Sequence, residues 1–158
     1  SRNSHDIPQA IESLERFILK VSDSKSDGIR RRKDSQRTQL YNDVIRYIGI
    51  NYANIELNVS YVADKFGISG ASLSFLFSEQ GEVKPSQYIN RVRIDHSKEL
   101  LSSGESLEAI AIKCGYASFR TFLRVFKQYE GVTPTQYRII SHADDQNGKG
   151  KEERDEKE

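Results

Sequence analysis

The sequence predicts an all-α protein in which two helix-turn-helix units are joined by one long linker helix, with about seven helices in total. Three observations support this prediction. Apolar residues recur at helical spacing from about residue 35 to residue 137, no segment alternates convincingly between apolar and polar residues, and one helical corner is encoded twice. Gly or Pro residues separate the periodic segments, as expected for helices joined by tight turns.

Each predicted unit begins with a short helix that ends at a glycine. Four residues at positions i, i+3, i+4 and i+7 form its inner face, and these are Val59, Val62, Ala63 and Phe66 in the first unit and Leu107, Ile110, Ala111 and Cys114 in the second. Gly67 and Gly115 follow directly, and a glycine can take the positive φ that ends a helix. Asn58 and Ser106 stand just before the two helices, where a side-chain oxygen can cap free backbone N–H groups.

The second helix of each unit is predicted to begin at a serine, Ser69 or Ser118, that acts as its N-cap. Three apolar anchors at i, i+3 and i+4 follow, and these are Leu73, Leu76 and Phe77 or Phe122, Val125 and Phe126. A proline, Pro85 or Pro134, comes eight residues after the last phenylalanine and is favourable in a first helical turn, where its missing N–H would be unpaired. Agreement at this many positions indicates an internal repeat.

A helix-turn-helix corner is typical of DNA-binding proteins, whose second helix presents its outer face to the major groove. An ordinary helical bundle can use the same corner, so the chemistry of the outer face matters. In the second unit, the outer positions are Arg120, Thr121, Arg124, Lys127 and Gln128. Arginine can pair bidentately with guanine and lysine can neutralise phosphate, so we expect these residues to bind DNA.

The corresponding outer face of the first unit carries no cation. Its residues are Ala71, Ser72, Ser74, Phe75 and Ser78. The serines can hydrogen-bond bases or phosphates, whereas Phe75 either packs on thymine methyl groups or is buried against a neighbouring helix. We therefore expect base reading mainly from the second unit and weaker binding by the first.

The residues from Pro85 to about Ser102 carry apolar side chains at helical intervals and predict the linker helix. Roughly 18 residues at ~1.5 Å each span about 27 Å, close to the ~34 Å between successive major grooves on one face of B-DNA. One chain can then place two recognition helices in successive major grooves of double-stranded DNA.

The predicted domain occupies residues 35–141, and polar segments flank it. For residues 1–34 we predict the end of a preceding domain or an amphipathic helix, followed by a basic linker. The stripe in this segment fits either a helix of a preceding domain or a short dimerising coiled coil, and consists of Ile7, Ile11, Leu14, Ile18 and Val21. Residues 22–36 predict the linker, whose basic run at 30–33 either contacts phosphate or is only solvated. Residues 142–158 predict a disordered charged tail.

The net charge of +1 conceals an uneven distribution. Residues 1–38 carry nine Lys/Arg and six Asp/Glu, residues 39–141 carry eleven and ten, and residues 142–158 carry four and seven. A small net charge therefore does not argue against nucleic acid as a partner.

Composition excludes several other classes of function. No run approaches the ~18 apolar residues of a membrane span, so we expect no membrane contact and a cytoplasmic location. One cysteine and three scattered histidines do not form a familiar zinc site, and Cys114 falls on an inner helical face, so we expect no metal, no cofactor and no catalysis. The chain begins at Ser1 and contains no methionine, and we expect it to be a piece of a longer protein.

Residues 39–139 resemble the DNA-binding domain of the AraC/XylS family of bacterial transcription regulators. The likeness lies in VSYVADKFGISGASLSFLF, PSQYINRVRI and SLEAIAIKCGYASFRTFLRVFKQYEGVTPTQYR, and is most specific over residues 115–138. It implies a seven-helix domain that binds an asymmetric DNA site, and a sensing or dimerising domain outside these residues. By position it assigns DNA contacts to Arg120, Thr121, Arg124 and Lys127, and to Ala71, Ser74 and Phe75. The chain departs from the family pattern at Phe75, where many members have a polar residue, and at Ser97, where many have alanine.

A second hypothesis is a helical protein-interaction or dimerisation domain with little direct DNA readout. The N-terminal stripe would then dimerise, and the paired corners would dock a partner such as RNA polymerase. Besides double-stranded DNA we therefore expect RNA polymerase as a partner, and a homodimer formed through parts outside this chain. Salt dependence separates the two hypotheses, because phosphate contacts release counterions and protein contacts of this kind do not.

Overall fold

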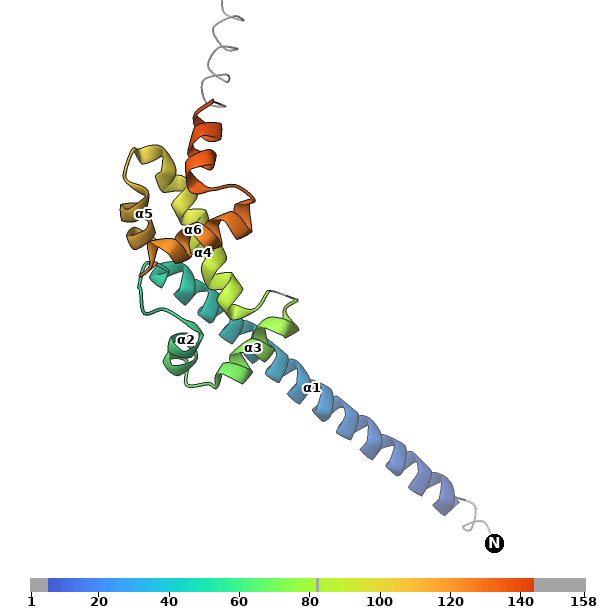
Figure 1. The fold of residues 1–158 in the computed structure, drawn as a ribbon. Coiled ribbons are helices and arrows are strands. Elements are labelled where there is room, and N and C mark those ends of the chain that lie inside the picture. Colours follow the sequence, from blue (N-terminus) through green and yellow to red (C-terminus); the bar gives the residue numbers. More distant parts are fainter. Residues whose placement is uncertain (1–5, 82, 144–158) are drawn as a thin grey trace, which may run out of the picture. The chain divides into compact units, whose positions relative to one another are not determined.

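The computed structural model describes residues 6–81 and 83–143, and every regular element in them is helical (Figure 1). This confirms the all-α prediction with about seven helices. The elements are α1 (Asp6–Asn51), α2 (Val59–Lys65), α3 (Gly70–Glu79), α4 (Pro85–Leu100), a 3₁₀ turn η1 (Leu101–Ser103), α5 (Leu107–Lys113), α6 (Phe119–Glu130) and a further helix over residues 134–143.

The chain divides into two compact parts, residues 1–42 and residues 43–158. The last turns of α1 belong to the second part, together with all the other helices and both helix-turn-helix units. The predicted disordered tail starts at residue 142, but residues 142 and 143 are still helical. The rest of that segment lies outside the described residues.

Helix α1 continues through residues 22–36, where the sequence predicted a linker between a short helix and the core. That interpretation was wrong because the segment contains one glycine, Gly28, and no proline, while its Lys, Arg and Gln residues favour a helix. A single glycine costs only about 1 kcal/mol relative to alanine in a helix interior. The apolar stripe predicted for this helix is exposed at each position whose side chain is described, Ile11, Leu14, Ile18 and Val21.

The predicted caps and turns are present in both helix-turn-helix units. The four cap side chains, those of Asn58, Ser69, Ser106 and Ser118, each accept a hydrogen bond from the backbone N–H three residues later, with lengths of 3.0–3.3 Å. Gly67 and Gly115 take φ values of 64° and 84°, which other residues adopt only with strain. Local sequence therefore determines where these four helices start and where the first helix of each unit ends.

The repeat is also visible in the packing of aromatic rings. Phe77 and Tyr88 meet edge to face with ring centroids 5.7 Å apart, and Phe126 and Tyr137 meet in the same way at the same distance. Each pair joins the second helix of a unit to the proline-started helix that follows it. The two units thus share a packing arrangement as well as a sequence pattern.

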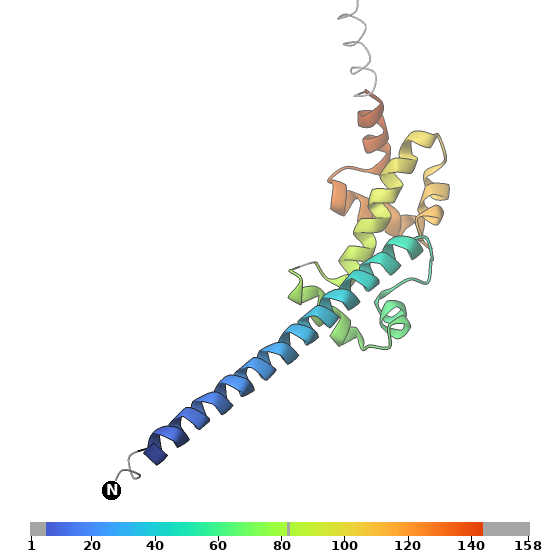
Figure 2. The same cartoon turned by 180° about the vertical axis from the view of Figure 1, so that it is seen from behind.

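Helix α4 connects the two helix-turn-helix units. In both views α2 and α3 lie near its start, whereas α5 lies toward its end and α6 crosses it (Figures 1 and 2). Its 16 residues span about 24 Å at ~1.5 Å per residue. The helix ends slightly earlier than predicted because η1 follows and Gly104 turns the chain with a φ of 77°.

Candidate nucleic-acid interface

Helix α6 has a buried face and an exposed cationic face. Its anchors Phe122, Val125 and Phe126 are buried, and they pack in one cluster with residues of α4 and α5 such as Ile94 and Ile110. The N-cap Ser118 and the left-handed Gly131 set the two ends of the helix. This packing holds the orientation of the outer face.

The outer face of α6 presents the side chains that the sequence predicted. Arg120, Arg124, Lys127 and Gln128 are exposed, and Thr121 is half-buried. Within the residues that the structure describes, none of the three cations forms an ion pair. Their charge is therefore available to an anionic partner such as phosphate.

The turn between α5 and α6 is joined to the linker helix at Tyr116. The Tyr116 hydroxyl donates a 3.3 Å hydrogen bond to Asn90 Oδ1 on α4. Burial raises the pKa of Tyr116, and the nearby charges of Arg93 and Arg124 act in the opposite direction. Arg124 is thus near enough to Tyr116 for its charge to act on this phenol.

The outer face of α3 in the first unit is exposed and carries no cation. Phe75 is 57% exposed, so the alternative in which it is buried against a neighbouring helix is wrong. The Ser78 hydroxyl donates to the Phe75 carbonyl oxygen over 2.7 Å, and the Ser72 and Ser69 hydroxyl oxygens lie 2.9 Å apart. These hydroxyls still have acceptor capacity for a ligand, because a hydroxyl oxygen has two lone pairs. The remaining outer residues, Ala71 and Ser74, are also exposed.

Sequence reasoning missed a buried arginine on the linker helix. Arg93 is 7% exposed, and its guanidinium donates to the carbonyl oxygens of Tyr52, Asn54 and Leu57 over 2.9, 2.7 and 3.1 Å. Burial lowers its pKa from the usual arginine value. A signal was available, because Arg93 lies four residues after buried Ile89 and four before buried Ser97, on the inner stripe of α4.

A second arginine plays the matching part in the second unit. Arg138 donates to the carbonyl oxygens of Leu101 and Glu105, each over 2.8 Å. Glu105 immediately precedes the N-cap of α5, just as Leu57, bound by Arg93, immediately precedes the N-cap of α2. Each unit thus has an arginine that holds the backbone leading into its first helix.

A small hollow of about 210 Å³ lies between α4 and the end of α6. It is lined by Val83, Gln87, Arg91, Gln128 and Tyr129. The Tyr129 hydroxyl donates to the Gln87 carbonyl oxygen over 2.9 Å, which joins the two helices there. The hollow adjoins the predicted DNA-binding face through Gln128.

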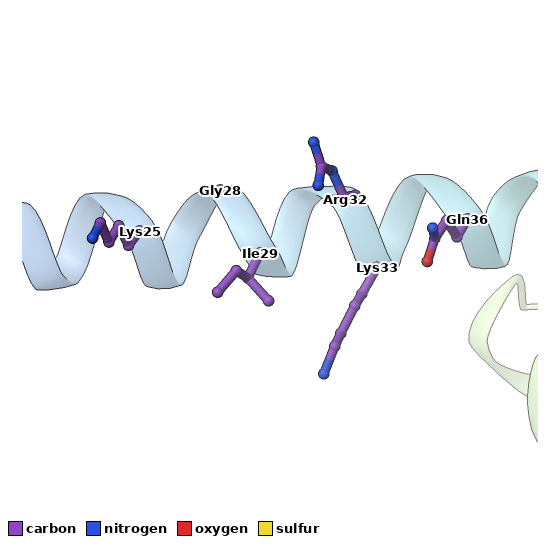
Figure 3. Close-up of a pocket in the computed structure, with 6 residues that line it drawn as sticks. All are labelled: Lys25, Gly28, Ile29, Arg32, Lys33 and Gln36. Carbon is purple, nitrogen blue, oxygen red and sulfur yellow. The ribbon is translucent and has the colours of Figure 1, made fainter.

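The basic part of α1 is an open helix surface. A shallow hollow on it is lined by Lys25, Gly28, Ile29, Arg32, Lys33 and Gln36, and Figure 3 shows that all six residues belong to this one helix. Arg32 and Lys33 extend from the helix in different directions. The lining residues all belong to α1, so this hollow is a shallow surface of a single helix.

The other candidate residues are placed as packing groups. Cys114 is fully buried, and burial raises the pKa of its thiol to about 11, which disfavours the nucleophilic thiolate. Ser97 is also buried, and its hydroxyl donates to the Ile94 carbonyl oxygen over 2.7 Å.

Over the described ranges there is no group of three or more His, Cys, Asp or Glu side chains that could hold a metal ion. None of the helices described combines the length and hydropathy that a membrane span requires.

The chain has two helix-turn-helix units, and the second helix of one of them exposes a cationic face. These features place it in the class of helix-turn-helix DNA-binding domains. The family described as a helix-turn-helix domain matches residues 62–139. The chain belongs to the AraC-type helix-turn-helix family of transcription regulators, as its resemblance predicted.

Individual relatives agree with this assignment. The chain is 32% identical over 111 residues to the HTH-type transcriptional regulator YijO of Escherichia coli K12, covering 69% of this chain and 39% of YijO. A crystal structure of a DNA-binding transcriptional dual regulator from Escherichia coli K-12 is 30% identical, with a TM-score of 0.56 over 63% of this chain and 89% of that one. A transcriptional regulator from Chromobacterium violaceum, described as having an AraC-type DNA-binding domain, shares the fold with a TM-score of 0.55, 24% identity and coverage of 62% and 88%. The chain thus spans less than half the length of the curated relatives it matches.

Proposed function

We propose that this chain is the DNA-reading part of a bacterial transcription regulator and binds double-stranded DNA sequence-specifically. Helices α3 and α6 enter successive major grooves, and α4 spans the distance between them. The observation that carries the proposal is the division of α6 into a buried aromatic face and an exposed face with three unpaired cations among the described residues. Such a face provides both groove-reading and phosphate-binding groups.

Each residue on the outer face of α6 has a proposed role. Arg120 and Arg124 pair with guanine edges, because a guanidinium can donate bidentately to O6 and N7. Lys127 neutralises a phosphate near the end of the helix. Thr121 and Gln128 donate or accept hydrogen bonds at a base edge or phosphate, according to the register of the helix in the groove.

The first unit reads its half of the site more weakly. Phe75 packs on thymine methyl groups, a role that its 57% exposure supports. Ser72, Ser74 and Ser78 contact phosphates or base edges, and the small Ala71 allows the helix to approach the groove closely. Because this face supplies no cation, the two halves of the bound site contribute unequally.

Selection of bound sequences from a random double-stranded DNA library tests the function with the full chain. We expect an enriched motif with one strongly and one weakly constrained half, and an affinity that falls steeply with salt. Absence of any enriched motif, together with salt-independent binding, would overturn the proposal. Two equally constrained halves would instead contradict only the asymmetry.

A second candidate function is self-association through the first part of α1, where Ile11, Leu14, Ile18 and Val21 are exposed at heptad spacing. We propose a second copy of the chain as the partner, because isoleucine at one core position, Ile11 and Ile18, with leucine at the other, Leu14, suits a two-stranded coil. Sedimentation of the chain and of Ile18→Asp tests this. We expect the wild-type chain to be a dimer and Ile18→Asp to be a monomer. A wild-type chain that is monomeric at high micromolar concentration would contradict self-association.

Contact with RNA polymerase stays a prediction.

We also propose that the domain acts by binding alone, without cofactor or catalysis, in the cytoplasm. The burial and raised thiol pKa of Cys114 support the absence of thiol catalysis, because the chain has no other thiol. Incubation of bound DNA with the chain should leave the DNA chemically unchanged, as electrophoresis and mass measurement would show.

A further inference from the structure

The inner side of α4 joins the two helix-turn-helix units at Arg93. This guanidinium donates three hydrogen bonds to residues 52–57, the segment that leads from α1 into α2 of the first unit. Its Cζ also lies over the ring of Tyr116, 5.5 Å from the ring centroid, and Tyr116 belongs to the turn of the second unit. One buried side chain therefore contacts the entry of one unit and the turn of the other.

The turn of the second unit packs directly against the same group. A Cβ placed on Gly115 would stand 2.9 Å from Arg93 Nε and would overlap the carbonyl oxygen of Tyr52. The first unit's entry segment, the guanidinium and the second unit's turn are thus in close contact at one point. Any movement of one unit against the other must change this contact.

A second interaction holds the same entry segment to α4. The rings of Tyr52 and His96 are stacked, with centroids 3.9 Å apart and planes 5° from parallel. His96 lies three residues after Arg93, so the two side chains contact residues 52–57 from adjacent positions on the helix. Their combined effect is to fix the path of residues 52–57 relative to α4.

The second unit is tied to α4 by separate contacts. Tyr129 donates to the Gln87 carbonyl oxygen, and Lys98 pairs with Glu130 over 3.1 Å. A loss of Arg93 would therefore leave α6 attached to α4, and the Phe77–Tyr88 ring pair would still join α3 to α4. The entry into α2 would loosen, and because α2 packs on α3, the predicted consequence is a wider range of α3 orientations relative to α6.

We propose that Arg93 is the positioning residue that sets the separation and angular phase of the two recognition helices, and so determines which spacing between two half-sites the protein accepts. The inference rests on the proposed function, because it concerns DNA read by both units. One added base pair turns one half-site by about 35° relative to the other, so a rigid protein tolerates only one spacing. A loosened protein accepts several.

The test uses the selected DNA site with one base pair added to or removed from the spacer between its halves. Arg93→Lys keeps the charge but replaces the three-point fork by a single ammonium group. The matched control is Arg138→Lys, because Arg138 makes the same kind of carbonyl bonds within the second unit only. Melting curves establish that each variant is folded.

We expect the wild-type protein and Arg138→Lys to lose about tenfold or more in affinity for each altered spacer, and Arg93→Lys to lose less than about threefold. Spacing discrimination that is unchanged in folded Arg93→Lys would overturn the proposal while leaving DNA binding intact. Failure of the wild-type protein to select any sequence would instead refute the proposed function.

A second measurement applies even when Arg93→Lys does not fold. Spin labels at Gln80→Cys and Gln128→Cys, in a Cys114→Ala background, report the distance between the ends of α3 and α6 in the DNA-free protein. A single narrow distance distribution is expected with Arg93 in place. A broad distribution would show that these contacts do not fix the two units, and would overturn the proposal.

Discussion

The carbonyl oxygen of Tyr52 occupies the space into which a side chain at Gly115 would project. Gly115 therefore has two reasons to be glycine: its φ of 84° and the close approach of another segment 63 positions earlier in the chain. The equivalent Gly67 has the positive φ, but no atom lies within 4 Å of the point where its Cβ would stand. The repeat thus contains one glycine that serves its own turn and one that also serves the contact between the units.

This difference predicts unequal effects of alanine substitutions on stability. Gly115→Ala should lower the free energy of unfolding by about 3 kcal/mol or more, because strain in the left-handed region is added to overlap with Tyr52. Gly131→Ala is the matched control, since Gly131 has a φ of 76° and no neighbour within 4 Å. It should cost only about 1–2 kcal/mol. Urea unfolding measures both values, and equal losses would contradict the packing role of Gly115.

Substitutions on α6 should separate base reading from phosphate binding. Arg124→Ala should weaken binding to the selected site by about 1–3 kcal/mol and relax the preference at one or two positions. Lys127→Ala should weaken binding to all sequences alike and reduce the salt slope by about one. Titrations at several salt concentrations measure both effects. If neither substitution altered binding, α6 would not be the reading helix.

Phe75 should matter more for DNA binding than for folding. Because Phe75 is 57% exposed, Phe75→Ala should leave the domain folded and lower the free energy of unfolding by no more than about 2 kcal/mol. It should weaken binding by about 1 kcal/mol, roughly fivefold, and remove a thymine preference in the weaker half-site. Ile112→Ala is the control, since Ile112 is a large apolar residue that is 60% exposed on α5. An equal loss of affinity in both variants would contradict the assignment.

The thiol of Cys114 should be protected in the native protein. Reaction with a thiol reagent should be slow at neutral pH and fast in urea, because the side chain is buried and the thiol pKa is raised to about 11. Since the unfolded thiol loses its proton at lower pH than the folded one, this group also contributes stability at neutral pH that is lost as pH rises through about 11. The Cys114→Ala variant should lack that part of the alkaline loss. Rapid labelling of the folded chain would contradict burial.

Much of the fold follows from short-range sequence patterns. The caps at Asn58, Ser69, Ser106 and Ser118, the glycine turns, and the inner faces of α2, α3, α5 and α6 involve residues within a few positions of one another, so their chemistry can be read along the chain. The same locality made the outer face of α6 predictable, because fixing Phe122, Val125 and Phe126 inward necessarily places Arg124 and Lys127 outward. Short-range patterns were misleading in α1, where a polar composition predicted a linker although its residues tolerate a helix.

The contacts that join the units depend on tertiary structure. Arg93 binds carbonyl groups 36–41 positions away, and the Gly115 turn packs against a segment that shares no motif with it. Backbone carbonyls are present at every residue, so no sequence pattern indicates which of them a buried guanidinium will find. The exposure of Phe75 was decided in the same way, by whether a neighbouring helix covers it. Sequence alone therefore determined the two reading units and the charge of their faces, whereas only the folded chain decided how the units are held together, because that depends on contacts between residues distant in sequence.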